Sequence, residues 1–212
     1  MSAVSCKQVL AKALARPLEN MPLAEGDVDA RGGSRAQTWR VRAPPDGAVR
    51  RLRVSSYTAS ERDAMKREVE LTCQSSMAEA APHLFDAGVS KVSPWKLQLL
   101  LEDYELGSLA EYVDSLDVKD LPAWEELDAA VERLLQKMRE QRICHRDLHS
   151  DNVVLHRLAG GALEARAIDW ESGTAKKSCG RADAGLLLAT LPAAKTRLLP
   201  LVRAFCESQP YF

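Results

Sequence analysis

The feature that most constrains the fold of this chain is a pair of short apolar segments that follow a dense polar stretch. Residues 153–155 are apolar, residues 165–168 are again strand-like, and a Gly-Gly pair at 160–161 supplies a turn between them. If the chain folds back about this pair, an antiparallel hairpin with nearly symmetric arms forms. The hairpin then places Asn152 and Asp169 side by side at its open end.

Those two side chains have the chemistry of a cation site. The amide oxygen of Asn152 and the carboxylate of Asp169 are hard oxygen ligands, the kind that Mg²⁺ prefers. Asp147 precedes Asn152 by five residues on the same loop, within reach of a substrate hydroxyl. The set therefore predicts a proton acceptor and two metal ligands on one hairpin. A zinc hydrolase built on His145, Asp147 and His149 is the alternative that the same loop allows.

Apolar periodicity predicts a strand-rich first half and a helix-rich second half. The clearest signal is the i, i+3, i+4, i+7 spacing of apolar residues over 127–138, which predicts a core helix. Ser60 followed by Asp63 resembles a capping box that opens a helix. The other predicted elements are helices at 3–16, 60–73 and 108–116, strands at 38–42, 49–55 and 96–101, and two closing helices from about Arg181 and Ala193. This order predicts an α+β protein with two lobes.

The net charge and the spacing of the cysteines limit which partners and which cellular compartment we expect. The 212 residues carry a formal net charge of -1, so we expect no DNA and no membrane partner. No apolar run approaches the roughly 20 residues that span a bilayer. The five cysteines are spread singly, without a CxxC pair. We therefore expect reduced thiols and a cytoplasmic location, intracellular and reducing.

Residues 145–152 read His-Arg-Asp-Leu-His-Ser-Asp-Asn and match every fixed position of the kinase catalytic loop H-R-D-L-x-x-x-N. The chain thus resembles a minimal or atypical member of the protein-kinase-like superfamily. The resemblance implies that Asp147 accepts the proton of the attacking hydroxyl, while Asn152 and Asp169 hold the metal that bridges ATP phosphates. It implies an ATP-dependent phosphotransferase that uses ATP and Mg²⁺.

The resemblance also implies a bilobal fold with a small β-rich N-lobe and a truncated helical C-lobe. We expect one domain over residues 1–212, with the N-lobe at 1–102 and the C-lobe at 103–212. The nucleotide-binding residues that the resemblance implies are Arg53 at the position of the strand lysine, Glu68 as its ion-pair carboxylate, Gly33 over the phosphates, and backbone groups of Glu102 and Tyr104 at the adenine. Asp183 resembles the buried aspartate that ties the next helix to the catalytic loop.

Two departures from the family pattern affect the nucleotide site. The family has lysine where this chain has Arg53, with Arg50 as a second candidate, and the planar fork of arginine is not equivalent to an ammonium group. Arg51 falls where the family has a small residue beside adenine. An alternative interpretation is that these arginines form a solvated strand face. The glycine pair that includes Gly33 lacks the full G-x-G-x-x-G spacing.

The substrate class stays open between three interpretations. Arg146 resembles protein kinases, whereas His149 and the run Ile-Asp-Trp-Glu at 168–171 are closer to aminoglycoside and choline phosphotransferases. About 14 residues separate Asp169 from Asp183, which leaves no room for a long activation segment. We predict transfer to a protein Ser/Thr hydroxyl, with a kinase of small hydroxylated molecules, aminoglycoside-like or sugar-like, as the first alternative. An inactive, kinase-shaped scaffold is the second.

Overall fold

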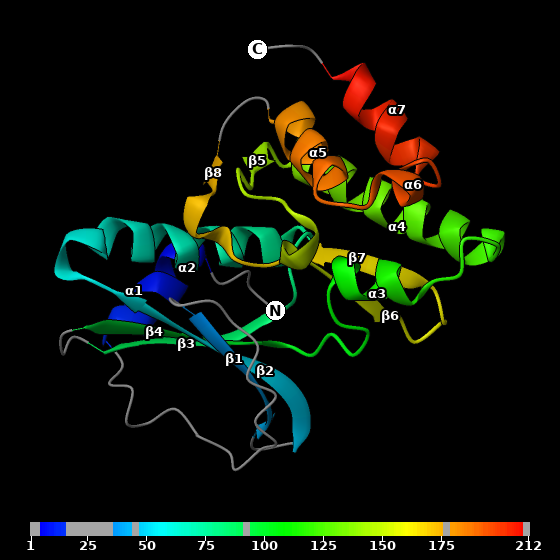
Figure 1. Cartoon of the computed structure of the whole chain (residues 1–212). Helices are drawn as coiled ribbons and strands as arrows, with labels where there is room; N and C mark the ends of the chain where they lie inside the picture. The colour runs from blue at the N-terminus through cyan, green and yellow to red at the C-terminus, as the bar shows by residue number, and fades with distance from the viewer. Residues whose placement is uncertain (1–4, 16–35, 44–46, 91–93, 176–178, 210–212) are drawn as a thin grey trace. The chain divides into compact units, whose positions relative to one another are not determined.

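The computed structural model describes residues 5–15, 36–43, 47–90, 94–175 and 179–209. Within it the chain forms two compact units (Figure 1). The first unit comprises Met1–Ser76 and Pro82–Asp103, and the second comprises Met77–Ala81 and Tyr104–Phe212. The predicted glycine loop at Gly33 lies outside the described residues.

The first unit is built on an antiparallel sheet whose strand order is β1-β2-β4-β3. Its strands are β1 (Ala36–Ala43), β2 (Ala48–Tyr57), β3 (Leu84–Ser90) and β4 (Trp95–Glu102). The three predicted strands are confirmed as β1, β2 and β4. The sequence did not predict β3, because its run Leu-Phe-Asp-Ala-Gly-Val-Ser lacks a clear period of two. Pairing along β4 determines its structure.

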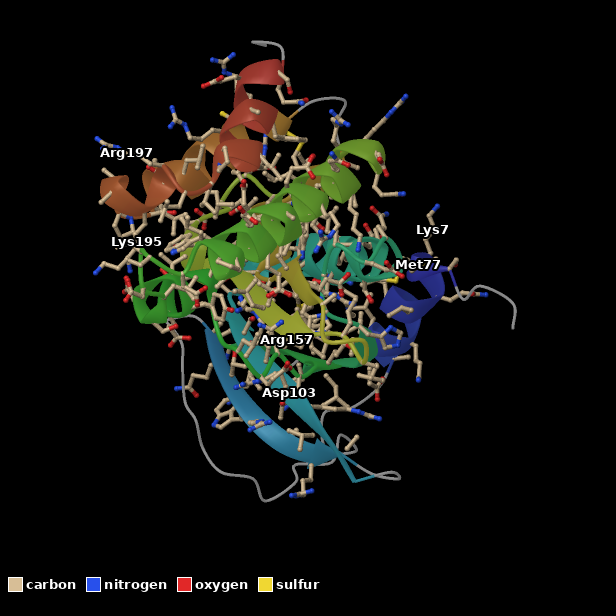
Figure 2. All side chains as sticks on the ribbon, turned by 90° about the vertical axis from the view of Figure 1, so that its right-hand side faces the viewer. Lys7, Met77, Asp103, Arg157, Lys195 and Arg197 are labelled. Carbon is tan, nitrogen blue, oxygen red and sulfur yellow. A yellow bond between two sulfur atoms is a disulfide. The ribbon has the colours of Figure 1, made fainter. Side chains whose placement is uncertain are left out.

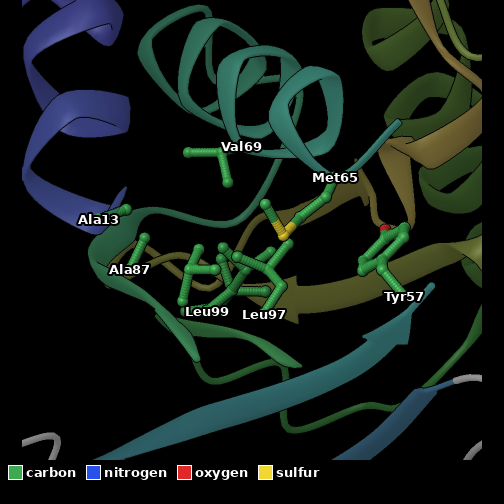
Figure 3. Close-up of a cluster of buried hydrophobic side chains, with 9 residues drawn as sticks. Ala13, Tyr57, Met65, Val69, Ala87, Leu97 and Leu99 are labelled. Carbon is green, nitrogen blue, oxygen red and sulfur yellow. The ribbon is translucent and has the colours of Figure 1, made fainter. Parts of the chain in front are cut away.

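Two helices cover one face of this sheet (Figure 1). Helix α1 (Cys6–Ala15) packs near β3, and α2 (Arg62–Met77) contributes Met65 and Val69 to the same core. Figure 3 shows these side chains meeting Leu97 and Leu99 from β4. Each fully buried aliphatic side chain of this kind stabilises the fold by about 1.5–3 kcal/mol.

The start of α2 differs from the predicted capping box at Ser60 and Asp63. A single 3-10 turn, Ala59–Glu61, precedes α2, and the reciprocal cap is made by Thr58 and Glu61 instead. The Thr58 amide donates to Glu61 Oε2 at 2.8 Å. The Ser/Thr-x-x-acid pattern occurs twice within this segment, and the earlier copy forms the cap because the chain turns two residues sooner.

The second unit packs its elements around a long amphipathic helix, α4 (Leu121–Glu140), as the apolar spacing predicted. Asp120 caps the start of α4, where its side chain accepts from the amide of Ala123 at 3.3 Å. The other helices are α3 (Leu109–Ser115), α5 (Gly180–Ala189), α6 (Ala193–Thr196) and α7 (Pro200–Ser208). The two predicted closing helices are α5 and α6, and α7 is an additional one. Helices α5 and α7 pack against each other and against α4 (Figure 1).

The predicted hairpin is confirmed as β6 (Val153–Arg157) and β7 (Leu163–Ala167), which pair from Val153↔Ala167 to Arg157↔Leu163. At the turn, the amide of Leu158 donates to Ala162 O at 2.9 Å. Gly161 takes a left-handed φ of 84°, which glycine adopts without steric cost. The glycine pair therefore fixes the register, as its central position in the sequence indicated.

The expectation that all five cysteines are reduced thiols is wrong for four of them. Cys6 is bonded to Cys73 and Cys144 to Cys179, with Cα–Cα distances of 5.6 and 5.3 Å. Cys206 is the free cysteine among the described residues. The partners are 67 and 35 residues apart, so only the fold brings them together and no local spacing indicated the pairing.

Candidate active site

The catalytic loop, residues 145–152, begins directly after the short strand β5 (Ile143–Cys144), which pairs with β8 (Thr174–Ala175). Asp183 on α5 holds the start of this loop. Its two carboxylate oxygens accept from the amides of His145 at 2.9 Å and Arg146 at 2.8 Å. Burial raises the pKa of Asp183 above its ordinary value, against the lowering effect of these two amide donors. The predicted tie between this aspartate and the loop is therefore present.

His145 packs beneath the loop as a structural residue. It is fully buried, its Nε2 lies 2.7 Å from Ile168 O, and its ring centroid lies 4.7 Å from that of Trp170 with the two planes tilted by 56°. Burial lowers the pKa of His145, which favours the neutral ring. The described residues contain no group of three or more His, Cys, Asp or Glu side chains that could hold a metal ion. The zinc alternative on this loop is therefore wrong.

Asp147 lies at the exposed tip of the catalytic loop. Its backbone oxygen accepts from the amide of His149 and from Asn152 Nδ2, both at 3.0 Å. Arg146, the residue before it, has a left-handed φ of 69°, which costs a non-glycine residue about 1–2 kcal/mol. The two bonds to Asp183 offset that cost and fix the direction in which the loop leaves β5.

Asn152 and Asp169 lie at the open end of the β6–β7 hairpin, as the sequence predicted. The amide of Ile168 donates to Asn152 O at 2.9 Å, one position beyond the Val153↔Ala167 pair. Asn152 is buried, and because its Nδ2 donates to Asp147 O, its Oδ1 is the side-chain atom that could bind a cation. Asp169 has a φ of 67° and opens the 3-10 turn Trp170–Ser172.

The donor set at this end of the hairpin fits Mg²⁺. Asn152 Oδ1 and the carboxylate of Asp169 are oxygen ligands, and Mg²⁺ is usually held by one or two protein ligands together with substrate phosphates and water. The sequence had indicated the same pair because the hairpin arms are symmetric.

The first unit contains the predicted arginine–glutamate pair. Arg53 Nε donates to Glu68 Oε1 at 3.3 Å, and the hydroxyl of Tyr57 is bonded to Glu68 Oε2. Glu68 is fully buried on α2, and the side chain of Arg53 is 9% exposed. The interpretation of these arginines as a solvated strand face is therefore wrong for Arg53. Tyr57 was missed, although it lies on the same face of β2 as Arg53 by the period of two.

The segment predicted to meet adenine begins where β4 ends. The amide of Glu102 donates to His83 O at 2.9 Å, and Glu102 Oε2 accepts from the amide of His83 at 3.1 Å. In the second unit, Tyr104 O accepts from the amide of Gly107 at 3.3 Å. Of the backbone groups predicted at adenine, the Glu102 amide and the Tyr104 carbonyl thus already have partners within their own units.

Asp103, labelled in Figure 2, is a residue of this segment that sequence reasoning missed. Arg51 Nε donates to its Oδ1 at 2.7 Å, and Arg40 Nη2 to its Oδ2 at 2.7 Å. Arg51 is buried, so the solvated-face interpretation is also wrong for it. Arg40 and Asp103 are 63 residues apart, and only the sheet register brings them together.

The two-unit α+β fold, with a polar loop directly before a β-hairpin, has the elements expected of a protein-kinase-like protein. Residues 78–175, just under half of the chain, match the phosphotransferase enzyme family (APH). This match confirms the resemblance and the α+β, bilobal kinase-like fold, and it supports a phosphotransferase activity in general. No curated protein matches the sequence. In the described residues, no helix is both long and apolar enough to cross a membrane.

Proposed function

We propose that this protein transfers the γ-phosphate of ATP, with Mg²⁺, to a hydroxyl group. In this proposal the first unit is the N-lobe (1–102) and the second the C-lobe (103–212). Asp147 accepts the proton of the attacking hydroxyl, and Asn152 and Asp169 hold Mg²⁺, which neutralises phosphate charge when bound. The observation that carries the proposal is that Asn152 is hydrogen-bonded both to Asp147 O and to the amide of Ile168, the residue before Asp169.

The chain's own residues account for positioning, which is most of what phosphoryl transfer requires. The exposed Asp147 lies on a loop whose start is held by two hydrogen bonds to Asp183. The backbone that carries the Asp147 carboxylate is therefore fixed in position. Arg53, held by the buried Glu68, offers a fixed positive charge to donor phosphates. Its guanidinium gives a wider, planar contact than the ammonium of lysine.

For the acceptor we propose a small hydroxylated molecule. The supporting observations are the family match over residues 78–175, the Trp170 turn directly after Asp169, and the short return to α5. A kinase that docks a peptide through an activation segment needs more chain between Asp169 and Asp183. A protein Ser/Thr hydroxyl is the second candidate, and Arg146 in the catalytic loop favours it.

The test is transfer of label from γ-labelled ATP with Mg²⁺ to an aminoglycoside panel or to a mixed protein substrate. We expect Asp147→Asn and Asp169→Asn each to lose about 10²-fold or more in rate, as removal of a proton acceptor or metal ligand does. Asp151→Asn is the matched control, because Asp151 is an exposed aspartate of the same loop. Label on small molecules supports the first acceptor, and label on protein supports the second.

If the wild type transfers no label and behaves as both variants do, the catalytic proposal fails. An inactive kinase-shaped scaffold is then the better account, and the observation that favours it is the buried Arg51 bonded to Asp103.

A further inference from the structure

The last part of the catalytic loop is held by the C-terminal end of α5. The amide of Ser150 donates to Thr190 Oγ1 at 3.0 Å, and Ser150 Oγ donates to Thr190 O at 3.4 Å. Thr190 Oγ1 itself donates to Leu187 O at 2.9 Å, so its proton is engaged and its lone pairs accept from Ser150. Ser150 is 3% exposed. The Thr190 hydroxyl therefore supplies the acceptor that a buried loop amide needs.

Helix α5 thus contacts the catalytic loop from both of its ends. Asp183 in its first turn accepts from the amides of His145 and Arg146, and Thr190 is its C-cap. The two residues form an i, i+7 pair, so they lie on one face of the helix and about 10 Å apart along its axis. Because a hydrogen-bonded helix keeps its length, the start and the last part of the loop are held at a fixed separation.

The two contacts of α5 act on different groups of the site. Asp147 directly follows Arg146, whose amide Asp183 holds. Ser150, held by Thr190, opens the 3-10 turn Ser150–Asn152. A shift of the first residue of this single turn moves the last one, and with it the side chain of Asn152. Asp183 therefore positions the backbone beside the proton acceptor, whereas Thr190 positions the turn that carries the proposed metal ligand.

We propose that Thr190 is a positioning residue for the metal ligand Asn152 and acts on it through Ser150. This inference rests on the proposed function, because it takes Asn152 as a ligand of Mg²⁺. Without the Thr190 hydroxyl, the Ser150 amide loses its acceptor, the turn moves toward another partner, and Asn152 Oδ1 is displaced. Loss of this hydroxyl therefore weakens binding of the divalent cation and leaves proton transfer to Asp147 nearly unchanged once the cation is saturating.

The test is binding of Mn²⁺, used in place of Mg²⁺, to the full chain with a non-hydrolysable ATP analogue, followed by the EPR signal of free Mn²⁺. We expect Thr190→Val to weaken Mn²⁺ binding about threefold to tenfold, the factor that corresponds to one lost hydrogen bond. In the transfer assay, the Mg²⁺ concentration at half-maximal rate rises by a similar factor. At saturating Mg²⁺, kcat stays within about twofold of the wild type, because the groups around Asp147 are unchanged.

Three further variants keep the result interpretable. Thr190→Ser keeps the hydroxyl and restores Mn²⁺ binding to that of the wild type. Thr196→Val is the matched control and leaves binding unchanged, because Thr196 Oγ1 makes the same bond to a carbonyl three residues earlier, Ala193 O at 2.9 Å, within α6. Thr190 is an exposed residue, so its substitution disturbs no core. Thr190→Ala removes the hydroxyl with a smaller side chain and gives the same weakening if valine does not fit at the helix end.

A Thr190→Val variant that binds Mn²⁺ as tightly as the wild type overturns this inference and leaves the proposed function in place. Weakened binding that Thr190→Ser does not restore overturns it as well, because the hydroxyl would then not be the group responsible. So does a loss of kcat at saturating Mg²⁺ as large as the loss of cation affinity. If the wild type neither binds Mn²⁺ with the ATP analogue nor transfers label, both the inference and the proposed function fail.

Discussion

Asp183 shows how one carboxylate positions a catalytic loop. It is 2% exposed, and each of its oxygens accepts one backbone amide of the loop. In Asp183→Asn, one carboxylate oxygen becomes an NH₂ group. This hydrogen-bond donor then faces a backbone N–H, which is itself a donor. We expect a loss of about 2 kcal/mol in the free energy of unfolding, the usual effect of breaking a hydrogen bond to a charged group. Urea unfolding measures it.

The same substitution separates positioning from folding. At a temperature where Asp183→Asn is still fully folded, transfer from ATP falls because the loop that carries Asp147 is no longer held at both amides. Asp114→Asn, a change at an exposed aspartate of α3, is the control and leaves both quantities unchanged. An Asp183→Asn variant that is destabilised but retains full activity contradicts the positioning role.

The environment of Glu164 predicts how the free energy of unfolding depends on pH. Its Oε2 accepts from Arg166 at 2.7 Å and lies 2.9 Å from His156 Nε2, and Lys137 bonds Oε1 at 2.9 Å. Burial alone raises the pKa of Glu164, but these three partners outweigh it and hold the pKa well below 4.5. Because the folded pKa is lower than the unfolded one, this stability is present above pH 4.5 and is lost as the pH falls further.

Glu164→Gln therefore lowers the unfolding free energy at pH 7 by about 2 kcal/mol, through lost charged hydrogen bonds. It also flattens the loss of stability that the wild type shows below pH 4.5. Urea midpoints at several pH values measure both effects. The control is Glu207→Gln, at an exposed glutamate of α7. A variant whose pH profile runs parallel to that of the wild type contradicts the prediction.

At the scale of elements, α7 depends on a residue of another helix. Asp128 on α4 accepts from the amides of Leu201 at 2.7 Å and Val202 at 3.0 Å, and so caps the start of α7. Asp128→Ala removes that cap and lowers stability by about 1–2 kcal/mol. Hydrogen exchange then accelerates in α7 more than in α4. Glu125→Ala, at an exposed position of α4, provides the control, and uniform acceleration in both helices argues against the cap.

The elements that the sequence predicted are those whose signal is local. The β6–β7 hairpin follows from its symmetric arms, and α4 from its apolar spacing, because each pattern lies within one segment. The strand β3 was missed because its pairing with β4, rather than its own residues, decides its structure. The cap of α2 was misplaced by two residues because two copies of one pattern competed there.

The residues of the candidate site also divide into those that the sequence could group and those that it could not. Asp147, Asn152 and Asp169 could be grouped from the sequence because one loop and the hairpin that directly follows it carry all three. The bonds of Asp103 to Arg40 and Arg51 could not, because they depend on the register of three strands. Arginines on a strand are usually solvated, and only the tertiary structure shows that Arg51 has an acidic partner.

At the scale of the whole molecule, each unit contains one disulfide close to its proposed functional residues. In the first unit, Cys73 follows Glu68 on α2 and bonds Cys6 of α1. In the second, Cys144 and Cys179 close a loop that contains Asp147, Asn152 and Asp169. Each bond therefore lies within one unit.

The Cys144–Cys179 bond predicts a thiol-sensitive catalytic loop. It closes a separation of 35 residues, for which chain entropy gives a stabilisation of about 4 kcal/mol. Cys179→Ser should lower the unfolding free energy under non-reducing conditions by up to that amount, and a dithiol reductant should lower that of the wild type by more, because it also reduces Cys6–Cys73. Transfer activity falls together with the unfolding free energy, because Cys144 directly precedes the loop that carries Asp147. Cys206→Ser is the control, since Cys206 is free. Five alkylatable thiols in the unreduced protein would show that neither bond forms.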